Sequence, residues 1–141
     1  MRVMVIVPGD RNSEAGVLPD TKILTEMGKF NEELVKAGVM LAGEGLRPTS
    51  YARRVKFSGD TPLVIDGPFT EAKEIISGFW LWQVKSMDEA VAWLKKAPFG
   101  GGTQIEIRPV FETADFGDAL TPELREAEDR MRAQSTLAEK K

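Results

Sequence analysis

The hydrophobic positions of this chain change spacing along the sequence, which predicts strands and helices in alternation. Residues 2–7 are nearly all apolar, which is typical of a strand buried on both faces, and Pro8 and Gly9 end it. From Asp20, an expected N-cap, to Gly38, an expected stop, apolar residues recur at helical spacing. They are Ile23, Met27, Phe30 and Leu34. We therefore expect a central strand followed by an amphipathic helix of about four to five turns.

The middle of the chain predicts two further strands of the sheet and a hairpin. A second strand is expected over residues 39–46, and residues 53–57 and 63–66 predict a β-hairpin around Ser58-Gly59-Asp60. Residues 78–84 predict the next strand. Phe79 and Leu81 fall on one face of that strand, and Trp80, Trp82 and Val84 fall on the other. Both faces are apolar, so neither is expected to meet water.

The second half repeats the pattern of a helix followed by a strand. Ser86 and Glu89 have the spacing of a capping box, and the helical stripe after them ends before Pro98 and three glycines at 100–102. Residues 104–111 predict the last strand of the sheet. The order β-α-β, hairpin, β-α-β predicts an α+β fold of the ferredoxin-like, split βαβ kind with an inserted hairpin. The three glycines follow a helix and enter a strand, the reverse of a phosphate-binding loop.

The pattern changes after Phe111 to a charged tail. Thr121 and Pro122 are typical of a helix start, so we expect a short helix near residues 121–133, with fraying beyond 134. The expected organisation is one domain over residues 1–113 and a C-terminal extension over 114–141.

Four motifs occur in an order and spacing that resemble one known family. They are Gly43-Glu44-Gly45-Leu46-Arg47-Pro48, Asp66-Gly67-Pro68-Phe69 followed by Glu71-Ala72-Lys73-Glu74, Gly78-Phe79-Trp80-Leu81, and Ile105-Glu106-Ile107-Arg108-Pro109-Val110. The chain is similar, over about residues 1 to 113, to the DGPF subgroup of the YCII-related proteins. The resemblance implies a ferredoxin-like domain that pairs as a dimeric α+β barrel. It also implies a stress or regulatory setting, because relatives are often associated with extracytoplasmic-function sigma factors.

Composition narrows the classes of function. With 141 residues, 42% of them hydrophobic, the chain suits a single core, and a net charge of −3 without a basic cluster argues against nucleic-acid binding. No apolar run reaches the length of a membrane span, and the N-terminus reads as a strand rather than a signal peptide. The chain has no cysteine, which agrees with a cytoplasmic location.

The chain also has no histidine, which removes the commonest acid-base group near neutral pH. The resemblance implies a catalytic histidine in the first helix and an aspartate before a Pro-aromatic pair. Here the first position falls near Met27, and the second reads Lys96-Ala97-Pro98-Phe99. The implied dyad is therefore missing, and acid or base chemistry would fall to a carboxylate, a lysine or Tyr51.

A homodimer is expected because the sheet packs helices on one face only. Trp80 and Trp82, together with Met4 and Ile6, would form a large apolar patch on the uncovered face, and a second copy would cover it. The alternative is a monomer whose tail and hairpin cover the patch. Two facing sheets would border a cavity for a small molecule.

The alternation of side chains along the strands predicts which residues line this cavity. If Leu41 and Ile107 face the helices, charged side chains face the cavity. The expected pocket residues are Glu44, Asp66, Lys73, Trp80, Trp82, Glu106 and Arg108. Glu44 and Arg108 would lie roughly 14 Å apart, across three strand spacings. The alternative is that Glu106 and Arg108 form a solvated or salt-bridged sheet edge.

Asp66 admits two interpretations. Its carboxylate could fold back onto backbone amides two residues on, so that the motif is a turn that aims the hairpin at the body. Alternatively Asp66 is a buried base at the pocket mouth, with Lys73 close behind it. Carboxylates at Glu44, Asp66 and Glu106 do not have the spacing of a known metal loop, and neither metal nor cofactor is expected.

Three functions remain open. The first is a dimeric protein that binds a small metabolite, accessory to stress or sigma-factor regulation. The second is a cofactor-free isomerase, lyase or monooxygenase that uses Asp66 or Glu44 as a base on a small aromatic or lactone substrate. The third is a structural protein-interaction module. The absence of histidine favours the first over the second.

Overall fold

The computed structural model divides the chain into two compact units, Met1–Pro109 and Val110–Lys141. It describes residues 1–70 and 74–139, of which 136–139 are described by their backbone alone. Each unit is described by itself below.

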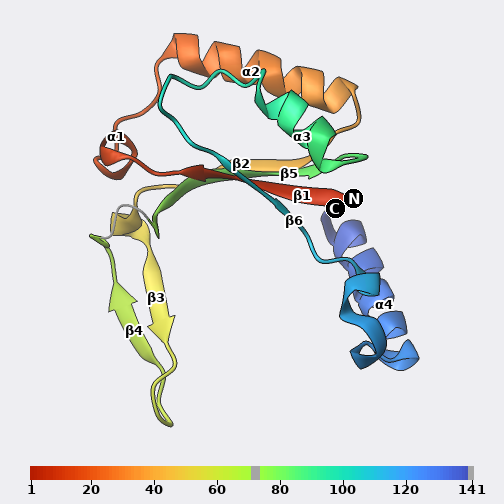
Figure 1. Ribbon diagram of the computed structural model, residues 1–141. Coiled ribbons are helices and arrows are strands. Elements are labelled where there is room, and N and C mark those ends of the chain that lie inside the picture. Colours follow the sequence, from red (N-terminus) through yellow and green to blue (C-terminus); the bar gives the residue numbers. More distant parts are fainter. Residues whose placement is uncertain (71–73, 140–141) are drawn as a thin grey trace. The chain divides into compact units, whose positions relative to one another are not determined.

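A four-stranded antiparallel sheet forms the body of the first unit (Figure 1). Its strands are β1 (Arg2–Pro8), β2 (Met40–Gly45), β5 (Ile76–Gln83) and β6 (Glu106–Pro109), in the spatial order β2-β5-β1-β6. β5 pairs antiparallel with both β1 and β2, and β1 pairs antiparallel with β6. The apolar runs of β1 and β5 thus occupy the two central positions, where both faces of a strand can be covered.

Helices cover one face of this sheet (Figure 1). α2 (Thr21–Lys36) begins after Asp20, whose carboxylate accepts a hydrogen bond from the amide of Ile23. α3 (Met87–Leu94) begins after Ser86, whose hydroxyl accepts from the amide of Glu89. Both caps satisfy amides that the first helical turn leaves unpaired. The predicted helix starts are therefore confirmed.

One helix is not anticipated by the sequence pattern. α1 (Arg11–Glu14) is a single turn between β1 and α2, and it begins at Asp10, whose side chain accepts from the amide of Ser13. Four residues are too few to show a hydrophobic period, so the pattern does not reveal this turn.

The core lies between the sheet and α2, and it contains both tryptophans of β5. Trp82 is fully buried and Trp80 nearly so, and the ring of Phe30 on α2 makes edge contacts with both. Leu34 from the same helix is also fully buried. The expectation that Trp80 and Trp82 lie on the uncovered face is therefore wrong, because the apolar stripe of α2 packs on them instead.

The other face of the sheet carries the alternate residues of each strand. Cross-strand pairing aligns them in two rows. One row is Glu44, Phe79, Ile6 and Glu106, and the other is Ala42, Leu81, Met4 and Arg108. The apolar members of this open face are half-buried, and its outer ends are charged except at Ala42.

The expected orientation of Leu41 is also wrong. The pairing of β2 with β5 is irregular between Met40 and Ala42, so Met40 packs against the core and Leu41 is exposed. Ile107 on β6 does pack against the core, as expected. One extra residue on the edge strand thus changes which side chain points inward.

A separate two-stranded hairpin extends from the first unit on the side of the sheet away from α2 and α3 (Figure 1). It consists of β3 (Arg53–Lys56) and β4 (Leu63–Asp66), and a short 3-10 helix, η1 (Thr49–Tyr51), precedes it. Every residue of the two strands is exposed. The predicted hairpin is confirmed, with its strands within one residue of the predicted ranges.

The second unit contains a 3-10 segment, η3 (Thr113–Ala119), and one long helix, α4 (Pro122–Glu139). The hydroxyl of Thr121 accepts a hydrogen bond from the amide of Leu124 at the helix start, as predicted. The helix continues to Glu139, so the expected fraying from residue 134 is not observed in the described range. No helix within the described ranges has both the length and the apolar content needed to cross a bilayer.

Candidate functional site

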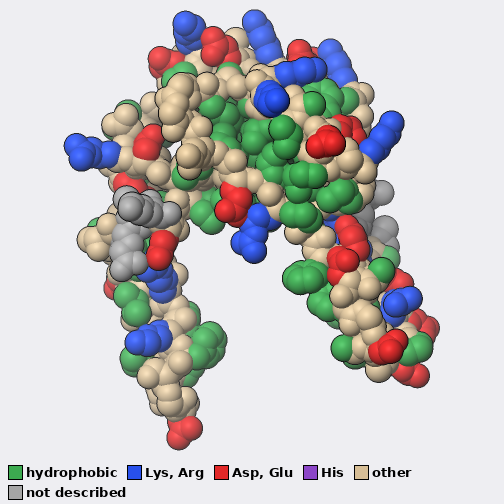
Figure 2. Space-filling view, viewed as in Figure 1, with side chains coloured by type: hydrophobic (Ala, Val, Ile, Leu, Met, Phe, Trp, Pro, Cys, Tyr) green, Lys and Arg blue, Asp and Glu red, His purple; other side chains and the backbone are tan. Residues whose placement is uncertain are grey.

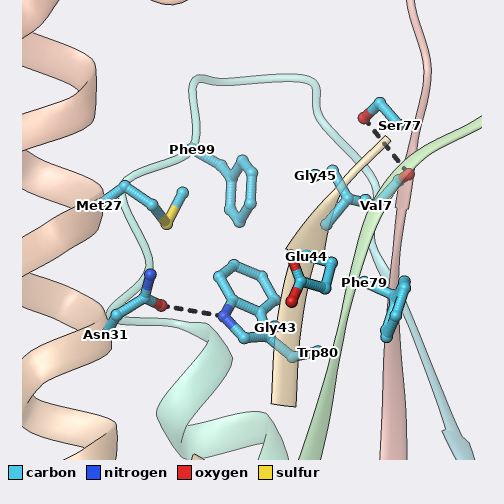
Figure 3. Close-up of a pocket in the computed structure, with 11 residues that line it drawn as sticks. Val7, Met27, Asn31, Gly43, Glu44, Gly45, Ser77, Phe79, Trp80 and Phe99 are labelled. Atoms are coloured by element: carbon cyan, nitrogen blue, oxygen red, sulfur yellow. Dashed lines mark hydrogen bonds between the residues drawn. The ribbon is translucent and has the colours of Figure 1, made fainter. Parts of the chain in front are cut away.

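A recess of about 220 Å³ opens between α2 and the β2 and β5 side of the sheet (Figure 3). Met27 and Asn31 of α2 form one wall, Trp80 forms the base, and Phe99, from the segment after α3, closes the far side. Residues 43–45 of the edge strand β2 border the opening. Segments distant in sequence thus form one mostly apolar pocket.

One hydrogen bond connects the helix to the sheet inside this pocket. The indole nitrogen of Trp80 donates to Oδ1 of Asn31 over 2.9 Å (Figure 3). Because an indole N–H can only donate, the oxygen of the Asn31 amide must face Trp80, and the amide nitrogen points the other way. Figure 3 shows this nitrogen directed toward the Met27 side of the pocket. Its N–H groups are therefore available to an acceptor atom on a ligand.

The base of the pocket depends on a glycine. Trp80 is paired across the strands with Gly43. A β-carbon at position 43 would lie 2.7 Å from Cδ1 of Trp80 and 2.8 Å from Cε of Met40. Such distances are too short for real contacts, so the indole lies directly against the bare backbone of β2. Position 43 thus sets how deeply the ring sits.

Glu44 is the one acidic residue among the described residues that line this pocket. Glu44 is exposed, and it forms no ion pair among the described residues. Its cross-strand partner is Phe79, so the Glu44 side chain belongs to the row on the open face, away from α2. The recess therefore combines an apolar base and an amide donor, and residues 43–45 of β2 border its opening.

Two residues close to the positions of the missing dyad line this pocket. Met27 lies near the position where the resemblance implies a histidine, and Phe99 belongs to the Pro-aromatic pair that the implied aspartate would precede. Both side chains are apolar, so they can hold a molecule by packing.

Asp66 lies at the base of the hairpin and is exposed. Its carboxylate forms an ion pair of 2.9 Å with Nε of Arg53, its partner across β3 and β4. The side chain of Asp66 is 73% exposed, so it is not a buried base. It also cannot bond the amide two residues on, because that residue is Pro68, which has no N–H. Asp66 instead stabilises the first cross-strand pair of the hairpin.

The rest of the Asp66-Gly67-Pro68-Phe69 motif connects the hairpin to the body. The amide of Phe69 donates to Oγ1 of Thr49 over 3.0 Å, and that hydroxyl donates to Oε2 of Glu14 over 2.5 Å. The amide of Thr49 donates to Oε1 of Glu14 as well. A β-carbon on Gly67 would overlap the carbonyl oxygen of Thr49, so only glycine fits this close approach. The motif is thus a turn with a fixed attachment to α1 and η1.

The remaining predicted pocket residues lie elsewhere. Glu106 and Arg108 are exposed on the edge strand β6, and Oε2 of Glu106 lies 3.5 Å from Nε of Arg108. They therefore form a salt bridge at the sheet edge, which is the alternative to a place in the pocket. Trp82 is in the core, and its indole nitrogen is buried without a hydrogen-bond partner. Lys73 lies outside the described residues. Of the expected pocket residues, Glu44 and Trp80 border the same recess. Glu44 and Arg108 are far apart, because β2 and β6 form opposite edges of the sheet.

Asn31 is the pocket residue that the sequence pattern does not single out. It stands one residue after Phe30 and four after Met27, so it continues the inward stripe of α2 with a polar side chain. A polar residue at an inward helical position is a usable signal for a buried hydrogen bond. Within the described residues, no group of three or more carboxylates is placed to hold a metal ion.

Comparison with known proteins adds one family and one relative. The sequence profile of the YCII-related domain matches residues 1–114. An uncharacterised protein of Rhizobium meliloti (strain 1021) is 33% identical over 72 residues, which cover 51% of this chain and 58% of that protein. The match thus spans little more than half the length of that relative.

Proposed function

Because the chain belongs to the YCII-related family, we propose that it is a small-molecule-binding protein whose site is the recess between α2 and the sheet. The observation that carries this proposal is the meeting of Met27, Asn31, Trp80 and Phe99 around about 220 Å³ of space. Apolar cavities of about 150 Å³ hold a benzene molecule, so this recess is large enough for one substituted ring. The predicted cavity between two facing sheets stays a prediction.

The side chains of the recess define the class of ligand. Trp80 and Phe99 offer an edge-to-face pair, with ring centroids 6.1 Å apart, beside which a flat ring can pack. The Asn31 amide favours a ligand with a carbonyl or ether oxygen. Among the described residues, the lining has no cationic side chain to offset the charge of an anionic ligand. The expected ligand is therefore a small, uncharged aromatic or lactone-like molecule with one acceptor oxygen.

The second candidate is a cofactor-free isomerase, lyase or monooxygenase, which would need one base beside its substrate. Glu44 borders the recess, and its side chain belongs to the row on the open face. Asp66 does not line the pocket and is paired with Arg53. Catalysis by this chain would therefore depend on a substrate that reaches Glu44 from the open face, and Glu44→Gln would abolish turnover while leaving binding in the recess intact.

We also propose that the protein pairs as a homodimer through the open face of the sheet, as a ferredoxin-like domain of the DGPF subgroup. The sheet order β2-β5-β1-β6 and the turn at Asp66–Phe69 support this assignment. The apolar centre of the open face consists of Met4, Ile6, Phe79 and Leu81. Phe79 and Leu81 thus stand where the sequence pattern predicts Trp80 and Trp82. The cytoplasmic location and the link to stress or sigma-factor regulation remain predictions from sequence.

Indole N–H resonances in a ¹⁵N NMR titration test the proposed pocket directly. Benzamide, benzaldehyde and a small lactone serve as probes. Binding in the recess shifts the indole signal of Trp80 and leaves that of the fully buried Trp82 nearly unchanged. Gly43→Ala and Phe99→Ala, which alter the base and the far side, change the affinity. A titration in which none of the probes moves the Trp80 signal would remove the support for this site.

Sedimentation equilibrium tests the pairing separately. Phe79→Lys places a charge at the centre of the open face and is expected to convert a dimer to a monomer. Val35→Lys on the exposed side of α2 is the matched control, because Val35 is 59% exposed and outside the core. A wild-type protein that is monomeric at all accessible concentrations would contradict the pairing without affecting the pocket.

A further inference from the structure

We infer that the β3–β4 hairpin, residues 53–66, is a docking arm that packs against the open sheet face of a second copy of this chain. This inference rests on the proposed pairing and is independent of the proposed pocket.

The arm exposes five large apolar side chains. Phe57 is 85% exposed and Val64 is 66% exposed. Val55, Leu63 and Ile65 are exposed as well. Green hydrophobic side chains follow the projecting arm in Figure 2. A two-stranded hairpin is marginally stable by itself in water, so such a surface favours a partner.

The attachment of the arm is built to hold it in place. Glu14, Thr49 and Phe69 form a chain of hydrogen bonds at its base, and Gly67 fits tightly against Thr49. The guanidinium of Arg54 stacks over the ring of Phe69, 3.7 Å from its centroid. The Asp66-Gly67-Pro68-Phe69 motif thus anchors the base of the arm to the body of the first unit.

The arm extends on the side of the first unit toward which the open face of the sheet is turned (Figure 1). Figure 1 shows β3 and β4 extending from one end of the sheet, away from α2 and α3. A second copy that covers the open face therefore comes within reach of the arm. In a two-fold symmetric pair the contact is reciprocal, so each arm meets the body of the other copy.

Charge complements this apolar match. Lys56 on the arm forms no ion pair among the described residues, and the same holds for Glu44 at the β2 edge of the open face. The other basic residues of β3 already have partners, because Arg53 forms an ion pair with Asp66 and Arg54 stacks over the ring of Phe69. At its other edge the open face carries Glu106, which is paired with Arg108 of the same face. A second copy thus supplies the carboxylate of Glu44 beside an apolar centre, which suits an apolar arm that carries Lys56.

Cross-linking provides the test, because the chain has no cysteine of its own. Val64→Cys is labelled with a benzophenone maleimide in isotopically light protein and mixed with unlabelled heavy protein. After irradiation, we expect cross-links from the light arm to heavy peptides containing β1, β2, β5 or β6. Val35→Cys, at a comparably exposed position on α2, is the control and should give no cross-links to these strands.

Dimer affinity provides a second measurement. Val55→Lys and Val64→Lys combined should weaken the dimer at least tenfold, and Val35→Lys should leave it unchanged. Both arm positions are exposed, so the fold of each subunit is retained, as circular dichroism would verify. An unchanged affinity of the arm variant, or cross-links confined to the labelled copy, would overturn the inference. If Phe79→Lys still disrupts the dimer in that case, the pairing stands and the arm role alone is wrong.

Discussion

Trp80 and Asn31 are joined by a hydrogen bond of 2.9 Å between the central sheet and the helix that covers it. This bond orients both the ring at the base of the recess and the amide that faces its interior. It is also the polar contact that fixes the spacing of α2 over β5 at this point. The two residues should therefore be coupled in both stability and binding.

A double-mutant cycle on this pair measures the coupling. Asn31→Leu leaves the buried indole N–H of Trp80 without an acceptor, so it should lower the free energy of unfolding by about 1–3 kcal/mol. Trp80→Phe removes the donor, and Asn31, which is half-buried, can then bind water. In the Trp80→Phe background the further cost of Asn31→Leu should fall by about 0.5–1.5 kcal/mol. Urea titrations of the four proteins give these values, and strict additivity would contradict the coupling.

Gly67 is expected to be intolerant of substitution. Gly67→Ala places a methyl group against the backbone carbonyl of Thr49, which cannot move aside as a flexible side chain can. We expect a loss of about 2–3 kcal/mol, at the upper end of ordinary point mutations. Thermal unfolding followed by circular dichroism measures it.

Gly28→Ala is the control for that substitution. Gly28 lies within α2, and a β-carbon at this position would meet open space, so alanine should stabilise the protein by about 1 kcal/mol through helix propensity. If both alanine variants shift the unfolding temperature in the same direction, the close approach at Gly67 does not govern its conformation.

The hydroxyl of Thr49 should control local opening of the hairpin base. Thr49→Val keeps the shape of the side chain and removes the group that joins Glu14 to Phe69. Amide hydrogen exchange at Phe69 should accelerate about 5- to 100-fold, which corresponds to about 1–3 kcal/mol. Thr25→Val is the control, since the Thr25 hydroxyl bonds only within α2. Equal exchange rates at Phe69 in both variants would mean that the network does not hold the turn.

Leu34 and Val35 form an adjacent pair with opposite expectations. Leu34 is fully buried in the tryptophan core, and Val35 next to it is 59% exposed. Leu34→Ala should cost about 2–5 kcal/mol through lost burial and a residual cavity. Val35→Ala should change the free energy of unfolding by less than about 0.5 kcal/mol. Chemical denaturation distinguishes them, and similar costs would mean that α2 presents a different face to the sheet.

The hydrophobic period predicts most elements because it is a local property. The start of α2 at Asp20, the start of α3 at Ser86 and the hairpin each depend on residues that are close in sequence. α1 escapes prediction because a single turn has no period. The irregularity at Leu41 escapes it because it arises from the pairing of β2 with β5.

The faces of β5 could not be assigned from sequence for a physical reason. Both faces are apolar, so alternation separates Phe79 from Trp80 without showing which one meets the helices. The choice depends on Phe30 and Leu34, which lie far away in sequence and pack on the tryptophans. The pocket could not be predicted for the same reason, because Asn31, Gly43 and Phe99 are brought together only by folding.

The bare backbone at Gly43 has a consequence for selectivity. Alanine at that position would push the indole ring outward, and the recess would then exclude molecules that the glycine form accepts. Gly43, a residue of the edge strand without a side chain, would thus set the upper size limit for a ligand in the recess. Relatives with different residues there would discriminate among guests of the same chemistry by bulk alone.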